Sequence, residues 1–164
     1  MKILAFGSNL PFKENSPKRN IETAYEMLQE YKIKILKRSH LYQTEAYPNK
    51  SDPLFCNSAV SIETRLQPRE LLKVILEIEK KLGRERSKKN SPRTLDIDII
   101  CYDDLIIDEK NLKIPHPHVH QRPFVFLPIN DLDNLWIHPV YLKTIKEIIK
   151  EFDNEALNSV KKII

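Results

Sequence analysis

Glycine is nearly absent from this sequence, since Gly7 and Gly83 are the only two among 164 residues. A phosphate-binding loop built on several glycines is therefore excluded. Cysteine is equally scarce, and both Cys56 and Cys101 fall in strand-like stretches. We interpret them as reduced core residues of a cytoplasmic protein.

Long hydrophobic runs are also missing. No stretch approaches the roughly 20 apolar residues that a membrane-spanning helix needs. The first ten residues, MKILAFGSNL, turn polar too early for a secretory signal. We therefore expect no association with a membrane. The length is typical of one domain, and we expect residues 1–164 to form it as a monomer.

Positive charge is in excess, and it is unevenly distributed. The formal net charge is +4 with a pI of about 9.0, which suits a nucleic acid, a polyphosphate ligand or merely a lysine-rich composition. Between residues 79 and 93 the chain carries seven basic residues against two acids: Lys80, Lys81, Arg84, Arg86, Lys88, Lys89 and Arg93. This segment runs directly into the stretch SPRTLDIDII at residues 91–100.

Hydrophobic periodicity predicts an α+β fold. We expect strands over residues 2–8, 33–44, 55–64 and 95–102, and helices over 17–31 and 68–82. Ser16 and Pro17 are typical of a helix start, and Gly83 is typical of a helix end. The order β-α-β-β-α-β is that of the ferredoxin-like, or split β-α-β, fold. Such a sheet is mixed or antiparallel, with both helices on one face and the opposite face free for a site.

The rest of the chain gives weaker signals. Residues 115–129 contain several prolines, which favours irregular chain or short strands. One or two C-terminal helices should follow, marked by Leu142, Ile145, Ile149 and Phe152.

Asp96 and Asp98 are the most informative pair. Residues two apart on a strand project to the same side, with Cα atoms about 6.6 Å apart. Adjacent carboxylates resist joint ionisation unless a cation lies between them, and hard oxygen ligands suit Mg²⁺. An isolated pair would indicate only a solvated face or aspartates bound to lysines. The flanking Arg84, Arg86 and Arg93 favour a site for phosphoryl transfer, because guanidinium groups bind phosphate in a bidentate way.

Two further groups allow more than one interpretation. Phe55 and Asn57 share a strand face and could hold a flat heterocycle, or they could be an ordinary core residue and a turn-facing amide. His116, His118 and His120 alternate as in a zinc site, but no cysteine accompanies them. A histidine donating to phosphate suits His116 better, with Arg122 as a second anion contact. Phe124 fits either the core or a stacked ligand.

Taken together, these pieces resemble the 6-hydroxymethyl-7,8-dihydropterin pyrophosphokinase (HPPK) family of folate synthesis. The resemblance covers residues 1 to about 130, in the stretches FGSNL, SHLYQTEAY, FCNSAVSIET, LLKVILEIEKKLGRER, SPRTLDIDII and LKIPHPHVHQRPFVFLPI. It implies a ferredoxin-like fold. It also implies transfer of the β,γ-diphosphate of ATP to the pterin hydroxymethyl group, with release of AMP.

The resemblance also implies a role for each matching residue. Asp96 and Asp98 should bind two Mg²⁺ ions, and Asp98 could assist proton removal. Arg84 and Arg93 should hold phosphate and stabilise charge during transfer. Positions lining the ATP site are matched by Glu79, Ile99, Lys113, His116 and Arg122. Positions of the pterin pocket are matched by Thr44, Phe55, Asn57 and Phe124.

The polar loops 14–18, 48–52 and 87–91 fit mobile covers over such a site. If they close on ligands, ATP with Mg²⁺ should bind before the pterin. The 87–91 loop is short and lacks the aromatic residue that many family members carry there.

Two other classes of function are compatible with a basic ferredoxin-like domain. An RNA-binding module would need an aromatic RNP-like string, which the sequence lacks, and the aspartates would then lie next to phosphates. A two-metal nuclease would need a third or fourth clustered acid, for which Glu79 is the available residue. We therefore expect small-molecule substrates and no nucleic acid.

Overall fold

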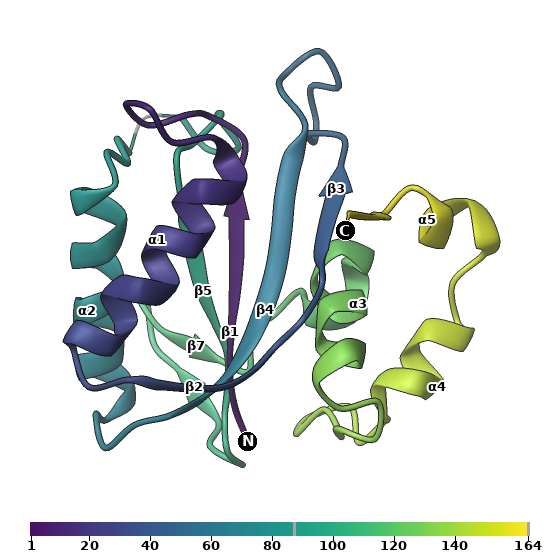
Figure 1. The fold of residues 1–164 in the computed structure, drawn as a ribbon. Helices are drawn as coiled ribbons and strands as arrows, with labels where there is room; N and C mark the ends of the chain where they lie inside the picture. The colour runs from purple at the N-terminus through teal and green to yellow at the C-terminus, as the bar shows by residue number, and fades with distance from the viewer. Residues whose placement is uncertain (87, 164) are drawn as a thin grey trace.

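The main sheet is antiparallel and has the strand order β5-β1-β4-β3-β8, with β2 also paired to β4 (Figure 1). The structure, a computed structural model, describes residues 1–86 and 88–163. The strands are β1 (Lys2–Ser8), β2 (Lys34–Arg38), β3 (Leu41–Thr44), β4 (Phe55–Glu63), β5 (Asp96–Tyr102) and β8 (Lys161–Ile163), and a separate hairpin joins β6 (Ile107–Asp108) to β7 (Lys113–Ile114). The helices are α1 (Pro17–Glu30), α2 (Pro68–Lys81), α3 (Pro123–Leu132), α4 (Ile145–Lys150) and α5 (Asn154–Asn158), with a 3-10 turn η1 (Val119–Gln121).

Both predicted helices form where expected and pack on one face of the sheet. Ser16 Oγ accepts a hydrogen bond from Arg19 N at 3.3 Å, as an N-terminal cap should. Gly83 follows α2 with φ +78°, and a Cβ there would lie 2.2 Å from the Phe12 ring. The apolar sides of α1 and α2 pack against one face of β1, β4 and β5. They form a first core that includes Leu4, Ile21, Leu28, Val60, Ile75, Ile78 and Ile97. The ferredoxin-like order of elements is confirmed.

The second predicted strand, residues 33–44, is divided in two. At Ser39 a side-chain oxygen takes the place of a backbone carbonyl in the pairing with β4. The Ser39 N–H donates to Ala59 O, and Ser39 Oγ accepts from Ala59 N, both at 2.9 Å. The strand is interrupted there, so β2 pairs with the C-terminal half of β4 and β3 with the N-terminal half. The prediction of one continuous strand was wrong at this point.

The prediction of irregular chain or short strands over residues 115–129 was wrong from Pro123 onward, where α3 begins. Pro123 stands in the first turn, where a missing N–H costs no helical hydrogen bond. Val125, Phe126, Ile129 and Leu132 are buried at helical spacing. Their burial stabilises the helix despite the internal Pro128.

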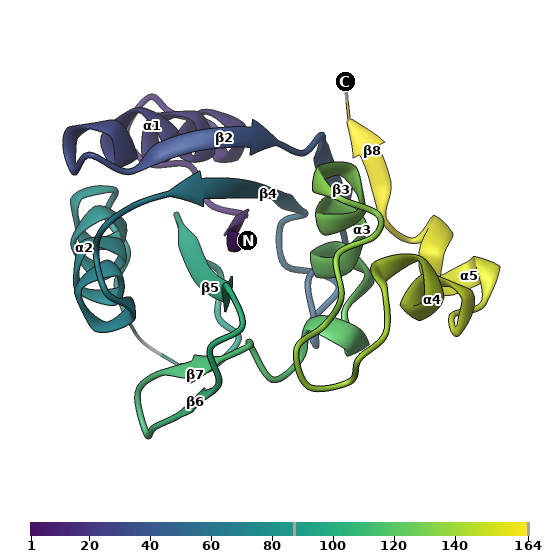
Figure 2. The same cartoon turned by 90° about the horizontal axis from the view of Figure 1, so that it is seen from below.

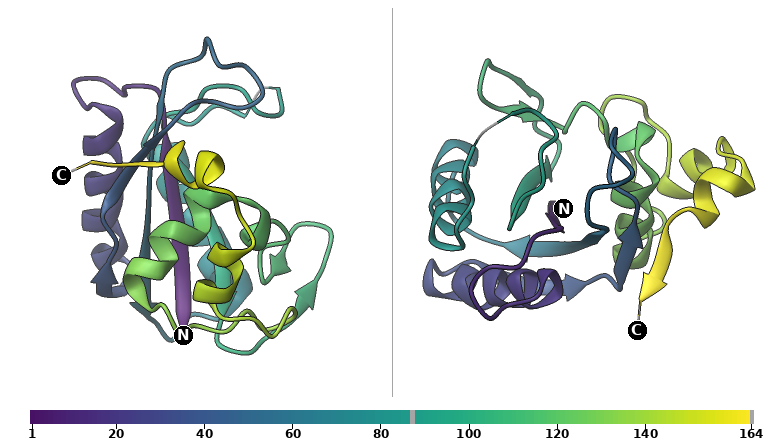
Figure 3. Two further views of the ribbon diagram at one scale, coloured as in Figure 1. Left: turned by 90° about the vertical axis from the view of Figure 1, so that its right-hand side faces the viewer. Right: turned by 90° about the horizontal axis from the view of Figure 1, so that it is seen from above.

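The second face of the sheet is only partly free, so that expectation needs correction. Side chains of α3 pack with Ile3, Ala59 and Ile100 in a second core, which covers one part of the face. Figure 2 shows α3 and the β6–β7 hairpin at the two sides of this face with β5 between them, and the view from above in Figure 3 agrees. The uncovered part lies along the ends of β1, β4 and β5.

The C-terminal segment contains the short helices that were expected. Ile145 and Ile148 of α4 are buried, and Phe152 packs on Phe126 with ring centroids 4.9 Å apart. Leu142 is not part of a helix; it precedes α4 and is 76% exposed, so it was wrongly included in the helical pattern. Cys56 and Cys101 are free and buried, as predicted. Within residues 1–86 and 88–163, no helix is long and apolar enough to cross a membrane.

The packing of α3 gives a stability prediction. Phe126 is fully buried between the sheet and Phe152, so Phe126→Ala should lower the free energy of unfolding by about 3–5 kcal/mol. Leu135→Ala is the control because Leu135 is 67% exposed, and its effect should stay within about 0.5 kcal/mol. Urea denaturation measures both, and equal effects would contradict the placement of α3 in the core.

Candidate active site

Two small residues on β1 keep the floor of the candidate site open. Gly7 pairs with Asn57 of β4 on one side and with Asp96 of β5 on the other, and Ala5 pairs with Asp98. A Cβ at Gly7 would lie 3.5 Å from Asn57 Oδ1 and 4.0 Å from Asp96 Cβ. The two carboxylates therefore project from β5 beside the part of β1 where Ala5 and Gly7 carry little side-chain bulk.

Asp96 is held by two guanidinium groups. Arg84 Nη1 donates to Asp96 Oδ1, and Arg93 Nη1 donates to Asp96 Oδ2 at 2.8 Å. The three side chains are partly shielded from solvent, with 13% of Arg84, 20% of Arg93 and 26% of Asp96 exposed. Charge-assisted hydrogen bonds in such a setting are stronger than those between neutral groups. Each oxygen of Asp96 is thus engaged by an arginine.

Glu79 holds one of these arginines, Arg84, together with Arg86. Its carboxylate on α2 is only 3% exposed and accepts from Arg84 Nη1 at 3.1 Å, Arg86 Nη2 at 3.2 Å and Ile97 N at 2.8 Å. Burial raises the pKa of Glu79, although the nearby Arg84 acts in the opposite direction. The structure therefore places Glu79 beneath the site, where it fixes the end of α2 to the start of β5.

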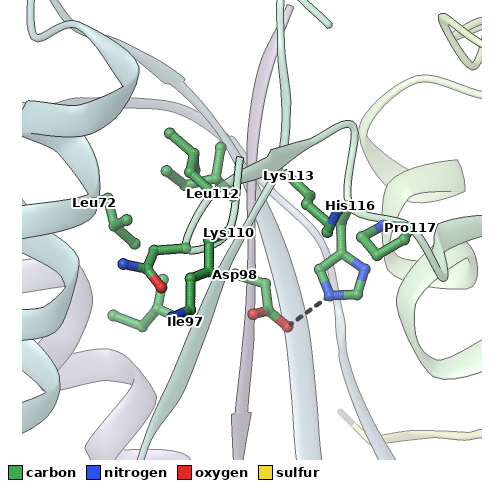
Figure 4. A pocket seen from close by; sticks show the side chains of 10 residues that line it. Leu72, Ile97, Asp98, Lys110, Leu112, Lys113, His116 and Pro117 are labelled. Carbon is green, nitrogen blue, oxygen red and sulfur yellow. Dashed lines mark ion pairs between the residues drawn. The ribbon is translucent and has the colours of Figure 1, made fainter. Parts of the chain in front are cut away.

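Asp98 is engaged quite differently from Asp96. Its Oδ2 lies 3.8 Å from His116 Nε2, and 39% of its side chain is exposed (Figure 4). The pKa of Asp98 is raised to about 7, first by partial loss of hydration among its neighbours and then by the negative charges of Asp96 and Glu79. A cation beside Asp98 would relieve this electrostatic conflict.

His116 is fixed as a neutral donor. Its Nδ1 accepts from His118 N at 3.2 Å, so the proton of the neutral ring is on Nε2, which faces Asp98. Burial, followed by the charges of Arg122 and His118, lowers the pKa of His116 to about 4. The ring is therefore uncharged near neutral pH and can donate one hydrogen bond from Nε2.

A pocket of about 270 Å³ opens between β5 and the β6–β7 hairpin (Figure 4). The pocket is lined by both apolar and polar or charged side chains. The apolar ones are Leu72, Ile97, Ile99, Leu112 and Pro117, and the others are Asp98, Lys110, Asn111, Lys113 and His116. Ile99, Lys113 and His116 were predicted from the sequence to line the ATP site. Leu72, Lys110 and Leu112 were not, because their approach to β5 depends on how α2 and the hairpin pack against it.

A second pocket, of about 240 Å³, lies over the basic segment. It is lined by Arg84, Glu85, Arg86, Lys88, Lys89, Asn90, Ser91 and Arg93. This segment includes most of the loop 87–91 predicted to be a mobile cover; Ser87 of that loop lies outside the described residues. Two of the cationic residues that line this pocket, Arg84 and Arg93, are the ones that bind Asp96.

Three of the residues matched to a pterin pocket lie on strands β3 and β4, and the fourth, Phe124, lies on α3. Asn57 Nδ2 donates to Thr44 Oγ1 at 2.9 Å, so the two side chains form one polar wall across β3 and β4. The Arg93 guanidinium lies 5.5 Å from the centre of the Phe55 ring. Phe124, at the start of α3, packs against the second core and lies 5.9 Å from the guanidinium of Arg122.

Two of the three alternating histidines, His116 and His118, lie close together, with ring centroids 5.9 Å apart. His118 contacts Gln121 Oε1 at 2.9 Å, whereas His120 packs on Tyr141 with ring centroids 4.0 Å apart. Among residues 1–86 and 88–163, no three His, Cys, Asp or Glu side chains are placed to hold a metal by themselves. A cation at Asp96 and Asp98 would need further oxygen ligands from water or substrate.

The sequence agrees with known pterin enzymes over most of its length. Residues 3–134 match the family model described as 7,8-dihydro-6-hydroxymethylpterin-pyrophosphokinase (HPPK). The 2-amino-4-hydroxy-6-hydroxymethyldihydropteridine pyrophosphokinase of Aquifex aeolicus is 38% identical over 128 residues, which cover 78% of this chain and 79% of that protein. The enzyme of the same name from Synechocystis is 38% identical over 125 residues, which cover 76% of this chain and 64% of that protein.

Longer proteins match as well. Folic acid synthesis protein FOL1 of Dictyostelium discoideum is 40% identical over 136 residues, 83% of this chain, but the match spans only 20% of that protein. The fold is similar to that of wild-type HPPK-DHPS from Plasmodium falciparum, with a TM-score of 0.77, 19% identity, and coverage of 99% of this chain and 48% of that one. The family model matches most of the chain, and the Aquifex aeolicus enzyme is 38% identical over 79% of its own length, so the chain belongs to the HPPK family.

Proposed function

We propose that this chain transfers the β,γ-diphosphate of ATP to the hydroxymethyl group of 6-hydroxymethyl-7,8-dihydropterin, releasing AMP, in folate biosynthesis. The observation that carries this proposal is the arrangement around Asp96 and Asp98. Asp98 lines a partly apolar pocket, and Asp96 is bound by two arginines that line a second pocket. The polar wall of Thr44 and Asn57 lies on β3 and β4.

The pocket beside β5 is the proposed nucleotide site. Ile97, Ile99 and Leu112 provide apolar surface for the base, and Lys110 and Lys113 provide positive charge. His116 can donate from Nε2 to a phosphate oxygen, and Arg122 would be a second anion contact. Glu79 would act on ATP through the arginines that it binds.

The two aspartates fit Mg²⁺ as its protein ligands, and we propose that Asp96 and Asp98 hold two ions together with the ATP phosphates. Both are hard oxygen donors on one strand face, and Mg²⁺ commonly takes one or two carboxylates and completes its shell with water and phosphate. When bound, the ions would neutralise phosphate charge and align the triphosphate for in-line attack.

The proposed pterin site lies over Gly7. Thr44 and Asn57 offer hydrogen-bonding groups to the edge of a flat ring, and Phe55 and Phe124 offer stacking faces. The pterin hydroxyl oxygen would then attack the β-phosphorus, and the bond from that phosphorus to the oxygen bridging to the α-phosphate would break. AMP leaves, and Asp98 can assist removal of the hydroxyl proton.

Arg93 supports the proposed order of binding, ATP with Mg²⁺ before the pterin. It contacts Asp96 on the nucleotide side and the Phe55 ring on the pterin side. When phosphates replace Asp96 as its partner, its guanidinium shifts relative to Phe55. The first ligand therefore alters the second site, and expulsion of water on closure strengthens the contacts inside.

The proposal also takes the chain as one domain that acts as a monomer in the cytoplasm on small molecules. The first and second cores share the central strands, which supports one domain. The buried, free cysteines suit a reducing compartment.

The reaction is tested by its products. Incubation with ATP, Mg²⁺ and 6-hydroxymethyl-7,8-dihydropterin should yield AMP and the pterin diphosphate in equal amounts, as measured by chromatography. EDTA should stop the reaction. Formation of ADP, or no consumption of either substrate, would contradict the proposed function.

Asp98→Asn separates catalysis from pterin binding. Loss of this carboxylate should lower turnover by about 100-fold or more, because charge neutralisation supplies much of the rate enhancement. The affinity for a pterin analogue, measured by fluorescence titration in the presence of an ATP analogue, should change by less than about threefold. Asp104→Asn, in the exposed turn after β5, is the control and should behave as wild type. Near-normal turnover of the Asp98 variant would refute its role.

A further inference from the structure

The strand that carries Thr44 has few backbone neighbours. β3 is four residues long and pairs over three residues with β4 and over three with the C-terminal strand β8. Thr44 is its last residue, directly before the loop that leads to Phe55. Backbone pairing this short leaves the position of Thr44 relative to α3 weakly determined.

One carboxylate oxygen ties this strand to α3. Asp131 Oδ2 accepts from His40 N at 3.0 Å, from the Tyr42 hydroxyl at 2.9 Å, and contacts His40 Nδ1 at 2.9 Å. The Asp131 side chain is 16% exposed, and Tyr42 is 8% exposed. Burial and the neighbouring carboxylate raise the pKa of Tyr42, so its hydroxyl stays protonated and donates.

The contact lies close to the polar wall of the proposed pterin site. Tyr42 and Thr44 are two apart on β3 and project to the same side. Tyr42 pairs with Asn57, whose Nδ2 donates to Thr44 Oγ1. A shift of Tyr42 away from α3 would therefore move both groups of the wall.

α3 also carries Phe124, the second proposed stacking face for the pterin. Arg122 is its N-cap residue and Phe124 stands in its first turn, and Asp131 is near its C-terminal end. Lys37 of β2 donates to Leu132 O at 2.7 Å, which fixes the same end of the helix against the sheet. Asp131 thus links the helix that bears Phe124 to the strand that bears Thr44.

We propose that Asp131 is a positioning residue for the pterin: its hydrogen bonds to Tyr42 and His40 set the spacing between α3 and β3 and so align Thr44 with Asn57. This inference rests on the proposed function for its substrate. Asp131 does not touch the ligand in this account, and it acts through Tyr42.

The test compares Asp131→Ala, Asp131→Asn and Tyr42→Phe with the control Ile129→Val. Ile129 is a fully buried residue of the same helix that belongs to the second core. The control removes one buried methyl group without changing the hydrogen bonds to β3. Affinities for a pterin analogue and for an ATP analogue are measured separately by titration.

Asp131→Ala should weaken pterin binding about tenfold and ATP binding less than twofold, since a displaced contact group costs affinity at its own site. Asp131→Asn keeps one acceptor oxygen and should lose less. Combining Asp131→Ala with Tyr42→Phe should add little to the stronger single effect, because both remove the same hydrogen bond. Ile129→Val should leave both affinities within twofold.

A second readout needs no substrate. Amide exchange at Gln43 and Thr44 should accelerate in Asp131→Ala, while amides of β1 and β5 keep their protection. Unchanged pterin affinity in Asp131→Ala, or equal losses of pterin and ATP affinity, would overturn the proposal. Failure of wild-type protein to bind the pterin analogue would instead refute the proposed function, and faster exchange at Thr44 would then still report the strand contact.

Discussion

The pairing of Asp96 with Arg84 and Arg93 is the interaction on which the site depends. Both oxygens of one carboxylate are taken by guanidinium groups, and the buried Glu79 holds Arg84 and Arg86 from beneath. The positive guanidinium groups and the negative carboxylates therefore neutralise one another, which offsets the free-energy cost of burying them. A polyphosphate with its metal ions carries the same two kinds of charge and can exchange partners with these groups. Among the described ion pairs, Asp98 has no arginine partner. Its carboxylate is therefore more accessible to a cation than that of Asp96.

The sheet makes this arrangement possible. Antiparallel register brings Asn57, Gly7 and Asp96 side by side, and the small Gly7 leaves room between a polar wall and a charged one. The first core, below the sheet, fixes the strands with α1 and α2. Above it, α3 and the β6–β7 hairpin border the open part of the same face (Figure 2). In the proposed function, the central strands lie between the nucleotide site and the pterin site.

The spacing of apolar residues in the sequence, alternating in strands and helical in helices, predicted most of the sheet and the two helices that pack on it. Asp96 and Asp98 alternate with Ile97 and Ile99, so their common face followed from strand geometry alone. Prolines obscured α3, because Pro123 and Pro128 outweighed the helical spacing of its buried residues. Contacts between residues far apart in the sequence could not be predicted either. Lys110 reaches the pocket through a hairpin, and Asp131 meets Tyr42 across 89 positions, so neither has a local pattern.

The central claim is that Asp96 occupies the arginines until an anion replaces it, and binding of ATP without metal tests it most directly. In EDTA, Asp96→Asn should bind ATP about tenfold more tightly than wild type by calorimetry, since its arginines are released for phosphate. Asp98→Asn removes the same charge from the same face but frees no arginine, and it should show a clearly smaller gain. Equal gains in the two variants, or no gain in Asp96→Asn, would contradict the account.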